Sequence, residues 1–181
     1  MKGLVFVELI KMAETMLGEA TVDDVLSKLD IPSGGSYTSV GYYSCDELIK
    51  LVNAFSEISD IARPELERVF GHWVMDAFKK GYPAQFENHQ TAFEMLASIE
   101  NQIHVEVRKL YPDAELPSLT TTTESDKLMK IEYQSSRPLA HFCLGLVERC
   151  IDLYGETASV ELIKYQAHDA KKATISVLRE Q

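Results

Sequence analysis

The chain has 181 residues, 45% of them hydrophobic, and a formal net charge of −10 at pH 7. This length suits one domain, or two lobes that share a core, and the hydrophobic content can fill a substantial interior. Because the charge is negative and no cluster of Lys or Arg stands out, binding to nucleic acid or to an anionic membrane is not expected. No apolar run approaches the roughly 20 residues that a membrane-spanning helix needs, so membrane insertion is not expected either.

The chain begins with amphipathic helical patterns. Residues 2–17 place apolar side chains on one surface, and Gly18 is suited to end that helix. Thr21 predicts the N-cap of a second helix ending near Leu29, because acidic residues follow it in the first turn. Residues 31–36 contain Pro, Gly and Ser and predict a loop.

Three further helical regions are predicted. Ser44 or Asp46 would cap a helix that runs to about Ser56. Pro64 suits the first turn of the next helix, which a Gly-Tyr-Pro sequence interrupts. A longer helical region then covers about residues 86–110 and is closed by a Tyr-Pro pair.

The pattern changes after Pro117, where threonine-rich and alternating segments predict strands. The predicted elements are strands at 118–123 and 127–137, a helix at 138–154 and strands at 160–165 and 174–178. Gly155 would end the helix, and a polar turn around residues 169–172 would join the last two strands. The order predicts an α+β fold, in which a helical N-terminal lobe precedes an antiparallel sheet with one helix packed on it.

The three cysteines, Cys45, Cys143 and Cys150, are an odd number without the Cys-x-x-Cys spacing of a metal site. The N-terminus also lacks the basic start and apolar centre of a signal peptide. We therefore expect three reduced thiols in a cytoplasmic protein, and their redox role stays open.

Three side chains suited to holding an anion recur at every second residue: Tyr133, Ser135 and Arg137. In an extended strand these residues would project from one face, with two hydroxyl groups beside a guanidinium group. Charge-assisted bidentate bonds to a carboxylate or phosphate are strong, so the pattern indicates a site for an acidic ligand. The alternative is the polar face of a strand on which Arg137 pairs with a nearby Glu.

The same residues, as Tyr-x-Ser-x-Arg, resemble the propionate-binding signature of the haem nitric oxide/oxygen-binding family, H-NOX. Residues 103–112, Ile-His-Val-Glu-Val-Arg-Lys-Leu-Tyr-Pro, resemble the family's proximal-histidine helix, and the opening Met-Lys-Gly is typical of bacterial members. The resemblance covers essentially all 181 residues. It implies a single domain over residues 1–181, with a helical lobe at about 1–60, a proximal helix and sheet lobe at about 61–181, and haem b held between them.

The resemblance assigns His104 as the proximal ligand of the haem iron, a role for which neutral imidazole is standard. Its neighbours Ile103, Val105 and Val107 are apolar, as expected for a haem wall. Pro117 matches a proline that presses on the porphyrin, although a loop proline between lobes is the alternative.

The resemblance also predicts which gas binds. Oxygen-binding relatives carry a distal tyrosine donor where this chain has Phe142. Other positions that match the haem wall are apolar as well: Val5, Leu9, Val74, Phe78 and Leu146. We therefore expect a sensor of nitric oxide, which also binds carbon monoxide and excludes oxygen.

The chain contains no effector domain and no convincing catalytic constellation, so we expect a non-enzymatic sensor that signals by contact. The resemblance implies a sensor histidine kinase or a cyclic-di-GMP enzyme as its partner. Residues 162–178 contain no cysteine and one histidine, His168, so a structural zinc is not expected. An oxygen-binding protein, a haem enzyme and a haem-independent module for an acidic ligand remain as alternatives.

Overall fold

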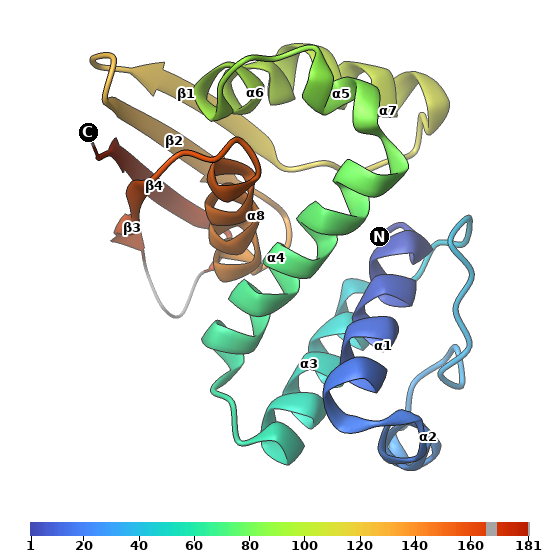
Figure 1. Ribbon diagram of the computed structural model, residues 1–181. Coiled ribbons are helices and arrows are strands. Elements are labelled where there is room, and N and C mark those ends of the chain that lie inside the picture. Colours follow the sequence, from blue (N-terminus) through green and yellow to red (C-terminus); the bar gives the residue numbers. More distant parts are fainter. Residues whose placement is uncertain (166–169, 181) are drawn as a thin grey trace.

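The computed structural model describes residues 1–165 and 170–180 (Figure 1). The helical elements are α1 (Gly3–Leu17), α2 (Glu19–Lys28), α3 (Cys45–Ser59), α4 (Arg63–Gly81), α5 (Pro83–Glu87), α6 (Ala92–Ser98), the π-helical turn η1 (Ile99–Ile103), α7 (His104–Leu110) and α8 (Ala140–Leu153). The strands are β1 (Ser118–Thr123), β2 (Leu128–Gln134), β3 (Ala158–Tyr165) and β4 (Lys172–Arg179). Asp169, at the start of the predicted turn, and the preceding His168 lie outside the described residues. None of the helices in the described ranges is both long and apolar enough to span a membrane.

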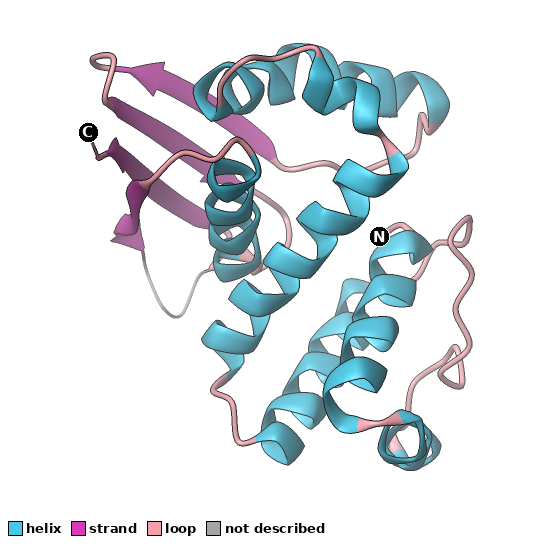
Figure 2. Cartoon of the chain, in the orientation of Figure 1, coloured by secondary structure: helices cyan, strands magenta, loops and turns pink. Residues whose placement is uncertain are grey.

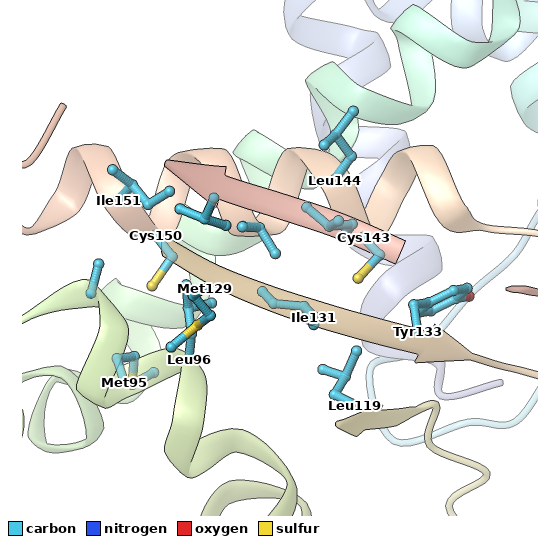
Figure 3. Packing of buried hydrophobic residues seen from close by; sticks show 14 of the residues in the cluster. Met95, Leu96, Leu119, Met129, Ile131, Tyr133, Cys143, Leu144, Cys150 and Ile151 are labelled. Carbon is cyan, nitrogen blue, oxygen red and sulfur yellow. The ribbon is translucent and has the colours of Figure 1, made fainter. Parts of the chain in front are cut away.

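The strands form an antiparallel sheet in the order β1-β2-β4-β3, and α8 packs on it (Figure 2). Alternate residues of β2 point inward, so Met129, Ile131 and Tyr133 are buried together. They share a core with Cys143 and Cys150 of α8 (Figure 3). The predicted sequence of a helical region followed by an antiparallel sheet with one packed helix is confirmed.

A second core lies within the N-terminal helices. Phe6 and Leu9 of α1, Phe55 of α3 and Phe70 of α4 have at most 1% of their surface exposed. Helix α4 contributes to this core, while its Met75 belongs to the core beneath the sheet. The long α4 therefore connects the two cores.

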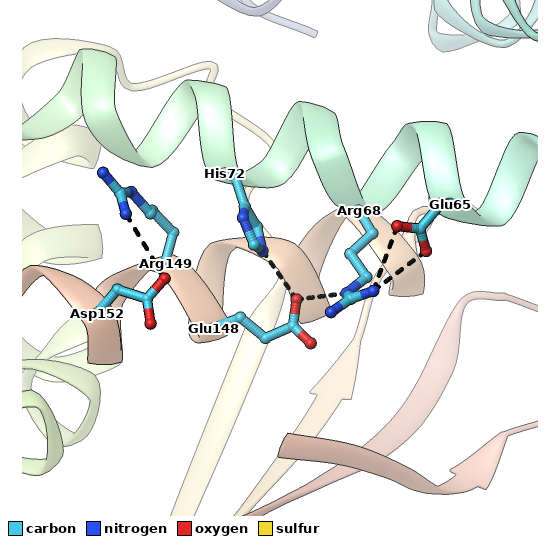
Figure 4. Close-up of polar contacts among 6 residues, drawn as sticks. All are labelled: Glu65, Arg68, His72, Glu148, Arg149 and Asp152. Carbon is cyan, nitrogen blue, oxygen red and sulfur yellow. Dashed lines mark hydrogen bonds and ion pairs between the residues drawn. The ribbon is translucent and has the colours of Figure 1, made fainter. Parts of the chain in front are cut away.

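Helices α4 and α8 pack closely, and polar side chains cross between them (Figure 4). Glu148 of α8 accepts a hydrogen bond from Arg68 Nε at 2.6 Å and lies 2.8 Å from His72 Nε2. The close approach of α4 and α8 depends on Gly145, because a Cβ atom at this residue would lie 2.0 Å from the carbonyl oxygen of Arg68. No side chain larger than hydrogen fits this crossing without separating the helices.

Local chemistry explains most helix ends and corrects one predicted cap. Ser44 caps α3 by accepting from the Asp46 amide at 3.1 Å, as predicted. The predicted cap at Thr21 was wrong, because Gly18, with φ of 86°, makes the sharp turn and α2 begins at Glu19. Pro64 lies in the first turn of α4, as predicted.

The prediction of a single helical region over residues 86–110 was also wrong. Thr91 interrupts it by accepting from the Glu94 amide at 3.2 Å, which begins α6 as a separate helix. The wider turn η1 then separates α6 from α7. Periodicity indicated helix throughout, but local side-chain bonds divide it.

Candidate proximal and anion-binding site

His104 is the first residue of α7 and follows directly on η1. Its amide donates to the carbonyl of Ile99, five residues earlier, which is the π-helical bond. Such turns are rare and are frequently found at functional sites. The His104 residue is 8% exposed, so its imidazole is almost wholly buried.

The imidazole of His104 is oriented by a carboxylate. Its Nδ1 lies 3.0 Å from Glu100 Oε2. Burial lowers the pKa of His104 below its usual value, and Glu100 opposes this only in part. The neutral ring therefore has its proton on Nδ1, and Nε2 has no hydrogen-bond partner among residues 1–165 and 170–180. Because every fully buried side-chain nitrogen or oxygen of the described residues has a hydrogen-bond partner, Nε2 is not fully buried.

Glu100 was not identified from the sequence. Its Oε2 also accepts from the Leu119 amide at 3.1 Å, and its Oε1 accepts from Arg108 Nη2 at 3.2 Å. Burial acts to raise the pKa of Glu100, but the bonds from Leu119, His104 and Arg108 outweigh it and hold that pKa below its usual value. The four-residue spacing of Glu100 and His104 was the signal that could have found the pair.

The predicted anion-binding side chains lie together, although not on one strand face. Tyr133 is in β2, whereas Ser135 and Arg137 follow the strand in a turn, so the predicted strand over 127–137 was too long. Tyr133 Oη donates to the carbonyl of Arg137 at 3.3 Å, and Ser135 Oγ accepts from the Arg137 amide at 3.1 Å. Burial raises the pKa of Tyr133, so its hydroxyl remains a donor.

Arg137 pairs with Glu115, as the alternative interpretation of the sequence required. Its Nη2 donates to Glu115 Oε2 at 2.7 Å, and its Nη1 donates to the Glu115 carbonyl. The Arg137 side chain is 12% exposed, whereas that of Glu115 is 73% exposed. An ion pair with so exposed a partner contributes about 1 kcal/mol at most, so a ligand carboxylate could replace Glu115.

Partly exposed apolar side chains lie where the two cores meet. Phe78 of α4 and Leu146 of α8 are half-buried and pack against both cores, and the half-buried Phe142 of α8 packs against the N-terminal core. Phe142 stacks near Phe70 with ring centroids 5.0 Å apart. Val5 of α1 is half-buried beside the N-terminal core. These residues can form the wall of an apolar site between the cores.

The other residues expected to contact haem differ in their burial. Leu9 and Val74 are 0% and 1% exposed and are packed within the N-terminal core. Of the apolar neighbours of His104, Val105 is 38% exposed and Ile103 packs against the core beneath the sheet. Pro117 is half-buried and precedes β1.

A model of the family described as Haem-NO-binding matches residues 2–162. The chain belongs to this family, H-NOX. A comparison with curated protein sequences found no match. H-NOX domains are haem-based gas sensors rather than enzymes.

Solved H-NOX structures share the fold over the whole chain. The unliganded Fe(II) protein from K. algicida is 32% identical, with a TM-score of 0.93, covering 100% of this chain and 97% of that one. The IWP-051-bound protein from Shewanella woodyi, in the Fe(II)CO state, is 34% identical, with a TM-score of 0.84 and coverage of 99% and 95%. The Fe(II)NO protein from S. oneidensis is 19% identical, with a TM-score of 0.91 and full coverage of both chains, and shows the fold alone.

Haem is the cofactor of H-NOX domains, and the residues present fit it. A buried neutral imidazole with a free Nε2 suits an axial ligand. Half-buried aromatic and aliphatic groups suit a porphyrin, and a guanidinium with two hydroxyls suits its propionates. Within the described ranges, no group of three or more His, Cys, Asp or Glu side chains could hold a metal ion, and the absence of zinc stays a prediction.

Proposed function

We propose that this H-NOX protein holds haem b through His104 and senses nitric oxide. The observation that carries the proposal is the state of His104, whose buried neutral ring is fixed through Nδ1 and leaves Nε2 free. A metal-binding histidine needs this arrangement, because the proton must lie on the nitrogen that does not bind.

Tyr133, Ser135 and Arg137 would bind the haem propionates. Arg137 would exchange the carboxylate of Glu115 for a propionate, which offers the same two acceptor oxygens in a less exposed place. Pro117 would press on the porphyrin, since it follows Glu115 in the same loop. Ordinary loop placement is the competing role for this proline.

Bound ferrous haem supplies one open coordination position for a small gas. Phe142, Phe78, Leu146 and Val5 offer no hydrogen-bond donor there. The chain's one indole, that of Trp73, is engaged, because its Nε1 donates to Glu8 Oε2 at 2.9 Å. Oxygen needs a donor far more than nitric oxide or carbon monoxide, so these side chains favour the latter two. Nitric oxide and carbon monoxide are the ligands of the S. oneidensis and Shewanella woodyi structures.

Signalling would follow release of His104 when nitric oxide binds. Helix α7 would then no longer be bound to the haem iron through His104. Pro117 would change its position as the lobes move. We assign residues 1–60 to one lobe and 61–181 to the other, with α4 carrying the movement because it contributes to both cores. This is a rigid-body switch driven by differential ligand affinity. The partner would be a sensor histidine kinase or a cyclic-di-GMP enzyme.

The test is the absorption spectrum of the purified ferrous protein, alone, in air and with nitric oxide. We expect a five-coordinate ferrous spectrum that air does not alter and that nitric oxide shifts with loss of His104. His104→Gly should require added imidazole to restore the wild-type ferrous spectrum, whereas His89→Gly, in the loop after α5, should not. A stable oxygen complex would refute the proposed selectivity and favour an oxygen-binding role. Purification without haem would favour a module for another acidic ligand, and turnover of peroxide would favour a haem enzyme.

A further inference from the structure

We propose that Glu100 is a positioning residue that sets how firmly His104 holds iron and therefore how readily nitric oxide releases it. This inference rests on the proposed role of His104. It concerns the carboxylate behind the ring, on the side away from Nε2.

Two donors from different elements fix the position of Glu100 Oε2. His104 Nδ1 approaches it at 3.0 Å from α7, and the Leu119 amide approaches it at 3.1 Å from β1. Two bonds on one oxygen leave the carboxylate little freedom to rotate. The direction of Nε2 is therefore determined by the sheet as well as by the helix that carries His104.

The charge of Glu100 has a second effect. A carboxylate that accepts the Nδ1 proton increases the electron density of the ring and makes Nε2 a stronger donor to a metal. Arg108 moderates this, because its Nη2 donates to the other carboxylate oxygen at 3.2 Å and draws charge from it. A neutral amide at residue 100 would keep both hydrogen bonds without the charge, so orientation and donor strength can be separated.

The bond to Leu119 also joins His104 to the loop that carries Pro117. Leu119 is two residues beyond this proline, at the start of β1. A ring that leaves the iron must break or stretch its bond to Glu100, or move Glu100 away from the Leu119 amide. Glu100 therefore resists the release of His104 and raises the nitric oxide concentration at which release occurs.

The first experiment compares the iron–histidine stretching frequency in the ferrous holoproteins by resonance Raman spectroscopy. We expect Glu100→Gln to lower the frequency and Arg108→Met to raise it. Glu106→Gln is the matched control, because Glu106 is an exposed carboxylate of α7 that pairs with Lys109 and does not touch His104. Equal frequencies in wild type and Glu100→Gln would overturn the inference.

The second experiment replaces the histidine side chain with a free ligand. In His104→Gly, imidazole can donate to Glu100 from its second nitrogen, whereas 1-methylimidazole cannot. We expect imidazole to bind about 10-fold more tightly than 1-methylimidazole, the loss usual when such a partner is removed. Adding Glu100→Ala should remove this preference, as a double-mutant cycle would show.

The outcomes separate this inference from the proposed function. If neither imidazole binds in His104→Gly, or if the wild type lacks an iron–histidine stretch, then His104 is not the ligand and the proposed function fails. If both bind but the preference is the same with and without Glu100, then His104 is the ligand and the role of Glu100 is refuted.

Discussion

Replacing Gly145 with alanine would test how closely the fold depends on the crossing of α4 and α8. The added Cβ would lie 2.0 Å from the carbonyl oxygen of Arg68 and 2.8 Å from its carbonyl carbon, whereas ordinary contact begins at 3.4 Å. The obstacle is main chain in the middle of a helix, so no side chain can rotate away. The two helices would have to separate by about 1.4 Å, the difference between contact and the built distance.

The expected cost follows from two opposing effects. Overpacking of this severity costs about 3 kcal/mol, while alanine gains about 1 kcal/mol over glycine inside a helix. The net destabilisation of about 2 kcal/mol should lower the Tm by about 4–8 °C in a chain of this size. Phe142 and Leu146 flank Gly145 on α8, so the displacement would also reach the proposed haem wall.

Thermal unfolding of the holoprotein followed by helical circular dichroism measures this, with guanidinium unfolding as an independent determination of the free energy. Gly81→Ala is the matched control, because Gly81 of α4 is a helical glycine like Gly145 of α8, but a Cβ atom at residue 81 would meet no atom within 4 Å. That variant should be as stable as the wild type or slightly more so. If Gly145→Ala were as stable as Gly81→Ala, the close crossing would be refuted.

Three further outcomes are expected. Phe142→Tyr adds a hydrogen-bond donor and should raise the oxygen affinity of the ferrous protein about 10- to 100-fold, which is the effect of one hydrogen bond to a charged group. Oxygen titration measures this, and an unchanged affinity would exclude residue 142 from the gas site. Burial raises the pKa of Cys143 and Cys150 to about 12, so both thiols should resist alkylation in the native protein at neutral pH. They should react only in denaturant or as the pH approaches that value. Rapid alkylation of the native protein, detected by mass spectrometry, would contradict their packing. Arg137→Met should speed the transfer of haem from this protein to apomyoglobin about 10-fold or more, whereas Glu115→Gln should not. Equal acceleration by both substitutions would indicate that the Arg137–Glu115 ion pair is purely structural.

The sequence determined the features that depend on neighbours along the chain. The alternating pattern after residue 126 predicted a strand, which the structure contains as β2. Its residues Met129, Ile131 and Tyr133 lie on the buried face, because side chains of a strand alternate between its two sides. Gly18 ended α1 because its backbone adopts a positive φ. The resemblance carried by the residues around His104 and Tyr133 identified the family, which the match over residues 2–162 confirms.

Only the tertiary structure decided which distant groups meet. The pairing of Arg137 with Glu115 joins a turn after β2 to the loop before β1. The bond from Leu119 to Glu100 ties β1 to the turn before His104. Periodicity and propensity act over a few residues, whereas these contacts depend on how whole elements pack, and packing fixes a side chain's partner only after the chain has closed around it.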